Sequence, residues 1–283
     1  MDDYRRELDA AVVAAREAGR IILGHYGAGA VAVETKPDDS PVTVADRQAN
    51  DAIVGLLRAT FPDDAVLSEE TPDDQARLGR SRVWIVDPLD GTRDFVARTG
   101  DFCVHVALTV DGVPTVGVVH QPVIDATFQA VRGQGAVVDA QGARTPLRVS
   151  ATSAASDVRV GVSRLNISAD LRHALAASGL DRRSIPIGAS VKLMAVARGA
   201  LDAVVSFTPG EREWDTCAPE VIVREAGGSY TDLDGHPLRY NQPDTARRRG
   251  TLVSNGACHA GLLALLGPAF EAARGHRAGG GPP

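Results

Sequence analysis

The sequence Trp84-Ile85-Val86-Asp87-Pro88-Leu89-Asp90-Gly91-Thr92 places two carboxylates where an apolar run ends. Residues 82–87 predict a buried strand that stops at Pro88, and the tight turn after it brings Asp90 back beside Asp87. Asp, Pro and Gly are common turn formers, so a simple turn is the plainest interpretation of this segment alone. Acidic residues elsewhere in the chain favour a functional interpretation.

Further carboxylates stand at the ends of other predicted elements. Glu69 and Glu70 follow a predicted short strand, and Asp215 begins a predicted helix. Each has an ordinary role on its own, as a solvated strand end or as a helix N-cap. If they converge on Asp87 and Asp90, each pair of like charges near 4 Å costs about 4 kcal/mol at an effective dielectric constant of 20. Such a cluster persists only when it is protonated or neutralised by cations.

The donor set predicts which cation would neutralise this cluster. Ligands that are all oxygen imply a hard cation, and Mg²⁺ is the one we expect. Zinc is disfavoured because the seven histidines are scattered and none pairs at the spacing typical of zinc ligands. Cys103, Cys217 and Cys258 form neither a CxxC pair nor a disulfide framework, which favours a reduced cytoplasmic setting.

Two turns of small residues offer groups that bind phosphate. Gly91 allows backbone N–H groups to point at an anion, especially where a helix begins. The stretch Gly188-Ala189-Ser190-Val191-Lys192 is a second such turn, and it enters a predicted helix. Lys36 and Lys192 are the only lysines among the 30 basic residues, which favours a function for both. The alternative for Lys192 is a surface lysine whose stem covers apolar neighbours.

The composition limits the class of protein. The chain has 283 residues, of which 44% are hydrophobic and 23% are charged, as in a globular protein with a sizeable core. A net charge of -6 disfavours a nucleic-acid polymer as partner, and the arginines at 247–249 are expected in a solvated loop. No apolar stretch approaches the roughly 18 residues of a membrane span. Asp2 and Asp3 stand where a secretory signal would carry positive charge. We therefore expect no membrane partner.

The predicted elements divide the chain into two halves. Residues 1–150 show helices and then a run of strands, an α+β order, and they carry most of the acidic candidates. Residues 151–273 alternate between helices and strands, an α/β order, and the Gly- and Pro-rich tail at 274–283 is predicted to be disordered. The predicted helices cover 3–23, with Gly24 as a stop, 44–60, 168–178, 189–199, 215–226 and a segment from about 257; the predicted strands cover 65–68, 82–87, 102–110, 115–121, 126–131, 136–139, 146–150, 158–162, 201–206, 228–232 and 251–254.

Longer motifs now point to a family. Trp84–Phe95 and Trp214–Gly228 resemble the paired signatures of the inositol monophosphatase superfamily of metal-dependent, lithium-sensitive phosphatases. Within that superfamily the chain is most similar to the 3'(2'),5'-bisphosphate nucleotidases of the CysQ type. The resemblance runs in order from Lys36 to Asn255, and its closer part rests on Lys36–Asp46, Leu67–Glu70, Asp87–Phe95, Gly117–Pro122, Trp214–Val221 and Thr231–Tyr240.

The resemblance implies a fold and a metal site. The fold would be a layered αβαβα sandwich of two halves with the metals at their junction, which agrees with the α+β and α/β orders found above. A further Mg²⁺ at Glu69 and Glu70 is also allowed. The implied ligands of two Mg²⁺ ions are Glu69, Asp87, Asp90, Asp215 and the carbonyl of Leu89.

The resemblance also implies catalytic and substrate contacts. Asp46 and Thr92 would form a hydrogen-bonded pair that orients and deprotonates the attacking water, with Glu69 nearby. The nucleotidases carry Ser-Arg-Ser-His where this chain has Ser163-Arg164-Leu165-Asn166, so a histidine is replaced. Arg164 and Lys192 would hold a second phosphate. The implied substrate contacts are Asp90, Gly91, Thr92, Arg164, Gly188, Ser190, Lys192 and Asp215.

These observations give a preferred function and alternatives. We expect a Mg²⁺-dependent phosphomonoesterase that removes the 3'-phosphate of adenosine 3',5'-bisphosphate by two-metal in-line attack of water. The first alternative is an inositol monophosphatase or a broader sugar or histidinol phosphate phosphatase. A catalytically silent nucleotide or cation sensor is an alternative of another class, although such a module would not need the water-activating pair. The resemblance further implies inhibition by lithium and allows a homodimer.

Overall fold

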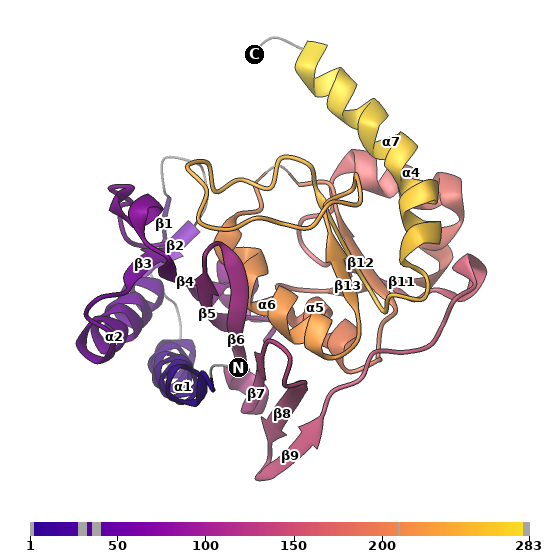
Figure 1. Cartoon of the computed structure of the whole chain (residues 1–283). Coiled ribbons are helices and arrows are strands. Elements are labelled where there is room, and N and C mark those ends of the chain that lie inside the picture. Colours follow the sequence, from indigo (N-terminus) through magenta and orange to yellow (C-terminus); the bar gives the residue numbers. More distant parts are fainter. Residues whose placement is uncertain (1–2, 28–32, 36–40, 209, 280–283) are drawn as a thin grey trace.

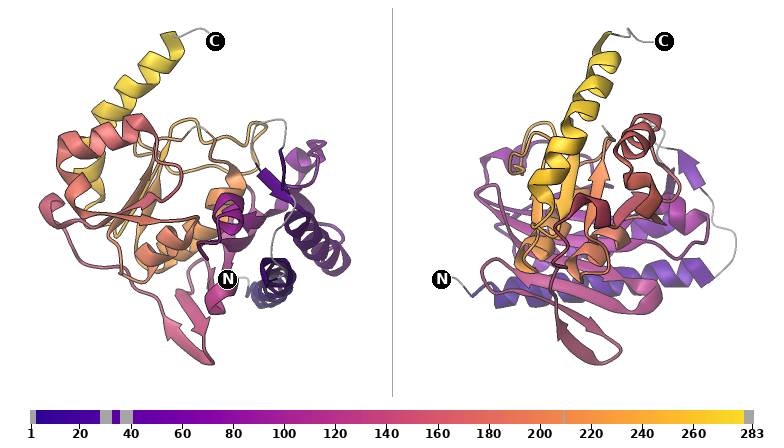
Figure 2. Two further views of the ribbon diagram at one scale, coloured as in Figure 1. Left: turned by 180° about the vertical axis from the view of Figure 1, so that it is seen from behind. Right: turned by 90° about the vertical axis from the view of Figure 1, so that its right-hand side faces the viewer.

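Two β-sheets form the framework of the fold, and helices lie between them and against their outer faces (Figures 1 and 2). This computed structural model describes residues 3–27, 33–35, 41–208 and 210–279. A seven-stranded sheet comes from the first half of the chain and a five-stranded sheet from the second half. A small third sheet pairs β1 (Val33–Thr35) with β2 (Pro41–Thr43).

The seven-stranded sheet keeps its strands in sequence order, and only β3 and β4 run parallel. In β5, Val104 and Val106 face one side of the sheet, and Cys103 and Ala107 face the other. Both faces are buried, which explains why the strand is almost continuously apolar in sequence. The strands are β3 (Ala65–Ser68), β4 (Arg82–Asp90), β5 (Cys103–Val110), β6 (Val113–Gln121), β7 (Ala126–Val131), β8 (Ala136–Ala140) and β9 (Ala143–Pro146).

The five-stranded sheet has the order β11-β10-β12-β14-β13. Its β10 runs parallel to both neighbours, and β14 is antiparallel to β12 and β13. The strands are β10 (Val160–Ser163), β11 (Ser184–Ile187), β12 (Ala203–Ser206), β13 (Ser229–Thr231) and β14 (Thr251–Ser254).

Three pairs of helices complete the layers. One pair covers the outer face of the seven-stranded sheet, a second lies between the sheets, and a third covers the outer face of the five-stranded sheet. The predicted αβαβα sandwich is therefore confirmed. Among the helices of the described residues, none combines the length and hydropathy of a membrane span. In the order of the layers, the pairs are α1 (Arg5–Gly27) with α2 (Val44–Thr60), α5 (Val191–Ala197) with α6 (Glu213–Glu225), and α4 (Ala169–Ser178) with α7 (His259–Gly279).

The two halves of the chain share one hydrophobic core. Val83 of the first half and Val204 of the second belong to the same buried cluster, which α5 and α6 fill.

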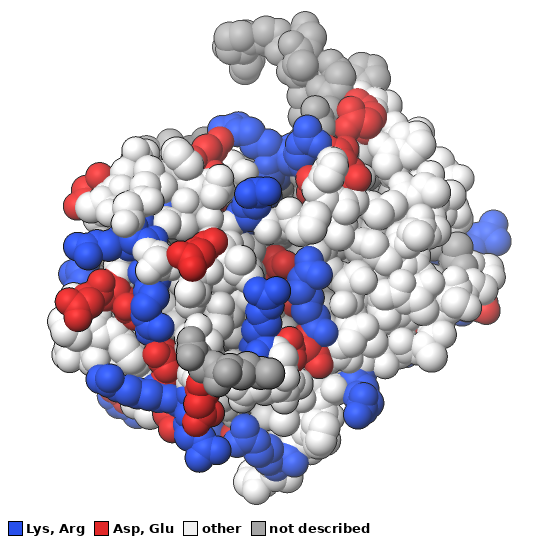
Figure 3. Space-filling view, viewed as in Figure 1, with Lys and Arg blue, Asp and Glu red and all other residues white. Residues whose placement is uncertain are grey.

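On the face shown in Figure 3, Lys and Arg side chains alternate with Asp and Glu. A nucleic-acid surface would instead gather basic side chains into a stripe. The boundary near residue 150 stays a prediction.

Three of the predicted boundaries in the first half are wrong. Strand β4 does not stop at Pro88 but runs to Asp90, because its pairing with β5 resumes at Asp90 after a shift of register. Helix α1 continues through Gly24 to Gly27, because a glycine inside a helix costs only about 1 kcal/mol and the buried face of α1 offsets it. The strand predicted at 146–150 is replaced by β9, which ends at Pro146. Gln141 and Gly142 both have positive φ, 53° and 78°, and this two-residue hairpin turn starts β9 three residues early.

Helix α7 extends to Gly279 and so includes residues 274–279 of the tail. The disorder of the tail at 274–283 stays a prediction. Residues 280–283 lie outside the described residues.

Gly117 of β6 provides the first testable prediction. A Cβ at this position would come within 2.6 Å of the carbonyl oxygen of Ala218 and 2.9 Å of Val221 Cβ, so glycine allows α6 to approach the sheet. Gly117→Ala should lower the free energy of unfolding by about 1–3 kcal/mol, as overpacking does. Urea titration followed by circular dichroism measures this change.

Gly55→Ala on α2 is the matched control. A Cβ there would meet nothing within 4 Å, and alanine should raise the free energy of unfolding by about 0.5–1 kcal/mol. A Gly117→Ala protein as stable as the unmodified chain would contradict the close approach of α6.

Candidate active site

Acidic side chains from both halves of the chain meet at the junction of the two sheets. Asp87 and Asp90 lie at the end of β4, and Asp215 lies in the first turn of α6. One carboxylate oxygen of each residue lies within 4.8 Å of the other two. The pairing of β4 with β5 shifts register between Asp87 and Asp90, which re-aims the side chains at the end of the strand. The structure thus brings these three predicted ligands together.

Asp87 is the most deeply buried of the three, with 1% of its surface exposed. The N–H of Leu89 donates to its Oδ1 at 3.0 Å, so the turn itself holds the carboxylate. Burial raises the pKa of Asp87 well above its usual range, and the charges of Glu69, Asp90 and Asp215 raise it further. Four acids therefore lie close enough to repel one another.

The N-terminus of α6 fixes Asp215. The N–H of Arg212 donates to the carboxylate of Asp215, in the position of a helix cap. Burial raises the pKa of Asp215 as well, and Asp90 and Glu69 add to the shift. A divalent cation would relieve this repulsion, and carboxylates are the ligands that hard cations prefer. The residues therefore fit the Mg²⁺ that the sequence predicts.

The loop that carries Glu69 and Glu70 is anchored to α2. Ser68 Oγ donates to Asn50 Oδ1 at 2.7 Å, and Asn50 Nδ2 donates to Thr71 Oγ1 at 3.2 Å. Asn50 thus holds the residue before Glu69 and the residue after Glu70, so the loop is fixed on both sides of the two acids.

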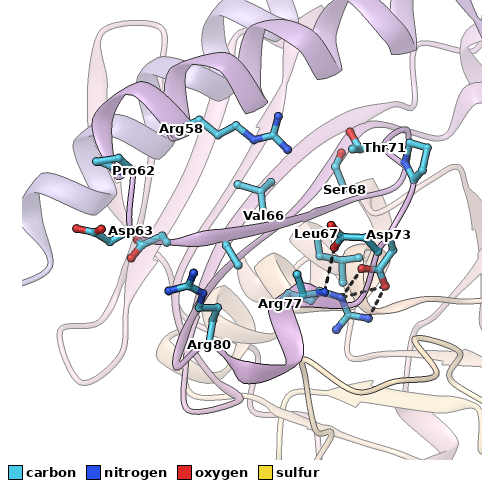
Figure 4. Close-up of a pocket in the computed structure, with 15 residues that line it drawn as sticks. Arg58, Pro62, Asp63, Val66, Leu67, Ser68, Thr71, Asp73, Arg77 and Arg80 are labelled. Carbon is cyan, nitrogen blue, oxygen red and sulfur yellow. Dashed lines mark hydrogen bonds and ion pairs between the residues drawn. The ribbon is translucent and has the colours of Figure 1, made fainter.

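A cavity of about 240 Å³ lies along the free edge of β3, apart from the acidic cluster (Figure 4). Buried Arg77 pairs with Asp73 at 2.8 Å and donates to Asn241 Oδ1 at 2.8 Å. Among the described residues, the lining of this cavity includes Ser68 and Thr71 but none of the four acids Glu69, Asp87, Asp90 and Asp215. Arg77 thus ties the loop after β3 to the loop before β14.

Asp46 and Thr92 form the expected pair. Thr92 Oγ1 lies 3.0 Å from Asp46 Oδ1 and 3.2 Å from the carbonyl oxygen of Leu89, and its single proton can be donated to either. Thr43 caps α2 and donates to Asp46 Oδ2 from both its N–H and its hydroxyl. Burial raises the pKa of Asp46, and the hydrogen bonds from Thr43 and Thr92 oppose that shift.

A cavity of about 400 Å³ is lined by Glu69, Asp90 and Asp215, and residues from both halves of the chain bound it. Gly91 has φ +90°, and a Cβ there would come within 2.7 Å of Ala189 Cβ, so only glycine fits. The N–H of Ser190 donates to Asp90 Oδ2 at 2.6 Å, which joins the two small-residue turns. The predicted residues that line this cavity are Glu69, Asp90, Gly91, Thr92, Ser190, Lys192 and Asp215.

Arg164 and Gly188 do not line this cavity, in contrast to their predicted role. Arg164 Nη2 and the N–H of Gly188 both donate to Asp101 Oδ2, at 2.7 Å and 2.8 Å. Asp101 therefore accepts from two of the donors that were expected to reach a phosphate, and no sequence motif indicated this role for Asp101. Lys192 Nζ donates to the carbonyl oxygen of Ala189. Lys36 lies outside the described residues.

Two further side chains near the site escaped prediction. Glu211 lines the cavity and accepts a hydrogen bond from Thr251 Oγ1 at 2.8 Å, and burial raises its pKa. Arg247, expected in a solvated loop, is 8% exposed. Its guanidinium lies 4.3 Å from the ring centre of Tyr240, and its Nε lies 3.2 Å from Thr216 Oγ1, beside Asp215. A run of arginines does not reveal which member turns inward.

Comparisons with known proteins agree with this fold. The model of the Inositol monophosphatase family matches residues 3–269. The 3'(2'),5'-bisphosphate nucleotidase CysQ of Escherichia coli (strain K12) is 36% identical over 252 residues, which cover 87% of this chain and 99% of that protein. A histidinol-phosphatase of Mycobacterium tuberculosis is 36% identical over 239 residues, covering 81% and 88%. The crystal structure of CysQ from Bacteroides thetaiotaomicron superimposes with a TM-score of 0.74 at 32% identity, covering 89% and 98%.

The repulsion among the acids predicts that the metal-free protein is destabilised by its own site. Asp87→Asn removes one buried charge, so it should raise the free energy of unfolding in EDTA by roughly 1–3 kcal/mol. It should also reduce the stabilisation produced by Mg²⁺. Because the pKa of Asp87 is raised in the folded state, the unmodified protein gains stability as the pH falls toward the ordinary carboxyl value near 4. The difference in the free energy of unfolding between Asp87→Asn and the unmodified protein should therefore become smaller at low pH.

Thermal unfolding with EDTA or Mg²⁺, repeated across this pH range, measures both effects. Asp63→Asn, which removes an exposed carboxylate far from the cluster, is the control. An Asp87→Asn protein that is less stable than the unmodified chain in EDTA would contradict the repulsion.

Proposed function

The chain belongs to the inositol monophosphatase family, and on that premise we propose that it is a Mg²⁺-dependent 3'(2'),5'-bisphosphate nucleotidase. It would remove the 3'-phosphate of adenosine 3',5'-bisphosphate. The observation that carries the proposal is the meeting of Asp87, Asp90 and Asp215, with Asp90 and Asp215 lining one cavity beside the pair of Asp46 and Thr92. The nucleotidase named above supports the choice of substrate, because it is similar over almost its whole length.

The metal ligands in this proposal are protein oxygens at the end of β4 and near it. Two Mg²⁺ ions bound there would supply hydroxide near neutral pH and stabilise the leaving oxygen of the ester. Glu70 would add a ligand for a further ion next to Glu69. The ligands of the first two ions would be Glu69, Asp87, the Leu89 carbonyl, Asp90 and Asp215.

Thr92 and Asp46 would handle the proton of the attacking water. When the hydroxyl of Thr92 donates to Asp46, its lone pairs are free to accept a hydrogen bond from water in the cavity. The two bonds from Thr43 hold Asp46 in place, so Asp46 Oδ1 stays within reach of the Thr92 hydroxyl. Glu69 would be the third member that orients this water.

The remaining contacts would hold the substrate. Gly91 and Thr92 begin α3 (Thr92–Val96) and would contact the scissile phosphate together with Asp90 and Asp215. Lys192 lines the cavity and would reach the second phosphate after it leaves the carbonyl of Ala189. Ser190 would shape this side of the cavity, and the N–H of Gly188 would reach the substrate only after it leaves Asp101. Arg164 would first have to leave Asp101.

A cytoplasmic location, a homodimer and inhibition by lithium also stay predictions.

A second candidate is a phosphatase acting on histidinol phosphate. The histidinol-phosphatase and the nucleotidase are equally similar to this chain, at 36% identity. Glu211 adds a carboxylate to the cavity, and a carboxylate favours a leaving group that carries an ammonium. Asn166 also stands where the nucleotidases were expected to carry histidine.

A phosphate-release panel decides between these functions. It compares adenosine 3',5'-bisphosphate, inositol monophosphate, fructose bisphosphate and histidinol phosphate, each with Mg²⁺ and with EDTA. We expect the highest kcat/KM for adenosine bisphosphate, no release in EDTA, and none from the Asp90→Asn variant. A preference for histidinol phosphate would establish the second candidate. No release from any ester would contradict both and favour a sensor.

The pair of Asp46 and Thr92 predicts a specific pattern of mutant rates. Asp46→Asn and Thr92→Ala should each lower kcat by about 10²–10⁴-fold with little change in KM, because general base catalysis contributes this much. The double variant should be no slower than the slower single variant, because the two residues act as a unit. Steady-state phosphate release measures both constants.

Thr92→Ser is the matched control, since it keeps the hydroxyl and should keep most of the activity. A Thr92→Ala protein within about tenfold of the unmodified rate would refute the proposed relay.

A further inference from the structure

A second group of metal-ligating atoms lies beside the four acids. Cys103 Sγ, a ring nitrogen of His105 and a carboxylate oxygen of Asp90 lie within 4.8 Å of one another. Cys103 and His105 stand two residues apart in β5, so their side chains share one face of the strand. Asp90 of β4 is the direct partner of Cys103 across the ladder. Pairing of the strands thus assembles a sulfur, a nitrogen and an oxygen.

His105 presents an unused lone pair to this group. The ring is completely buried, and its Nδ1 lies 3.2 Å from the carbonyl oxygen of Trp214. A carbonyl only accepts, so Nδ1 carries the proton and Nε2 is left as an acceptor. Nε2 has no hydrogen-bond partner among the described residues and lies 3.5 Å from Asp90 Oδ2. Asp90 Oδ2 already accepts from the Ser190 N–H, so His105 Nε2 is the atom left without a partner, and a cation between the two atoms would satisfy it.

We propose that Cys103, His105 and Asp90 form a site for a thiophilic divalent cation, with Zn²⁺ as the best fit. Thiolate and imidazole favour Zn²⁺, whereas Mg²⁺ prefers oxygen alone. In a tetrahedral zinc site the ligand atoms lie roughly 3.3–3.7 Å apart, and the 3.5 Å between His105 Nε2 and Asp90 Oδ2 meets this requirement. On binding, the thiol of Cys103 gives its proton to water and the sulfur bonds to the metal.

The route to the site runs through the cavity. Cys103 and His105 are fully buried, whereas Asp90 lines the cavity of about 400 Å³. A cation would therefore arrive past Asp90 and keep a coordination position open toward the cavity. A Cys-x-His spacing is not a familiar zinc motif in sequence, although it places both ligands on one face of a strand.

Zinc in this site would inhibit the phosphatase. Asp90 would be shared, because it is also a ligand in the proposed magnesium site, and zinc would take a carboxylate oxygen from that site. This consequence rests on the function proposed above, whereas the binding of zinc does not.

Metal binding to the metal-free, full-length protein tests the site directly. Zn²⁺ alone is titrated against a chelating indicator, and Co²⁺ is used as a spectroscopic probe, because a thiolate ligand gives cobalt a charge-transfer band in the near ultraviolet. We expect the unmodified protein to show this band. Cys103→Ser should abolish it, and both Cys103→Ser and His105→Asn should weaken zinc binding by at least about tenfold. Cys258→Ser, which removes a buried thiol outside the group, should change neither.

Inhibition by zinc is the second readout. Cys103→Ser should keep its Mg²⁺-dependent phosphate release and need at least about tenfold more zinc for half inhibition. The absence of a thiolate band in the unmodified protein, or equal zinc affinity in Cys103→Ser, would overturn the proposal. Should Cys103→Ser unfold, as seen by circular dichroism, His105→Asn gives the same comparison. Zinc binding as expected without release from any ester would refute the proposed function and leave the zinc site standing.

Discussion

The repulsion among buried carboxylates is the constraint on which this structure depends. Asp87 and Asp90 lie on β4, and Asp215 lies on α6. One carboxylate oxygen of each lies within 4.8 Å of the other two, and the charge of Glu69 is close by. Each like-charge pair near 4 Å costs about 4 kcal/mol at an effective dielectric constant of 20, which is a large part of the stability of a domain. The framework must therefore hold the acids against this repulsion until cations relieve it.

Main-chain donors provide much of that restraint. Each of the three acids accepts a hydrogen bond from a backbone N–H, which is fixed by the fold and does not swing away as a side chain does. The close approach of α6 to Gly117 places the helix that carries the third acid. Behind that helix, Arg247 adds a buried positive charge over Tyr240. The donors are Leu89 for Asp87, Ser190 for Asp90 and Arg212 for Asp215.

Local sequence signals predicted the α+β and α/β orders of the two halves and the acids at the ends of their elements, because an apolar strand that ends in an acid and a capped helix are recognisable without tertiary information. The αβαβα layers were predicted through the resemblance to a family. Asp46 was found through its resemblance to a family, since alone it reads as an ordinary helix N-terminal charge. Asp101, His105 and Arg247 were not found. Their roles depend on which segment the topology places opposite them, and neighbouring residues in sequence do not record that placement. Hairpin geometry at Gln141 likewise moved β9 by three residues.

Anomalous diffraction from crystals soaked in Mn²⁺, a cation that mimics Mg²⁺ and scatters strongly, shows whether these acids bind divalent cations. We expect two peaks between Glu69, Asp87, Asp90 and Asp215, with the Leu89 carbonyl turned toward one of them. Clear density for these side chains with no anomalous peak among them, at a Mn²⁺ concentration that supports phosphate release, would contradict this expectation.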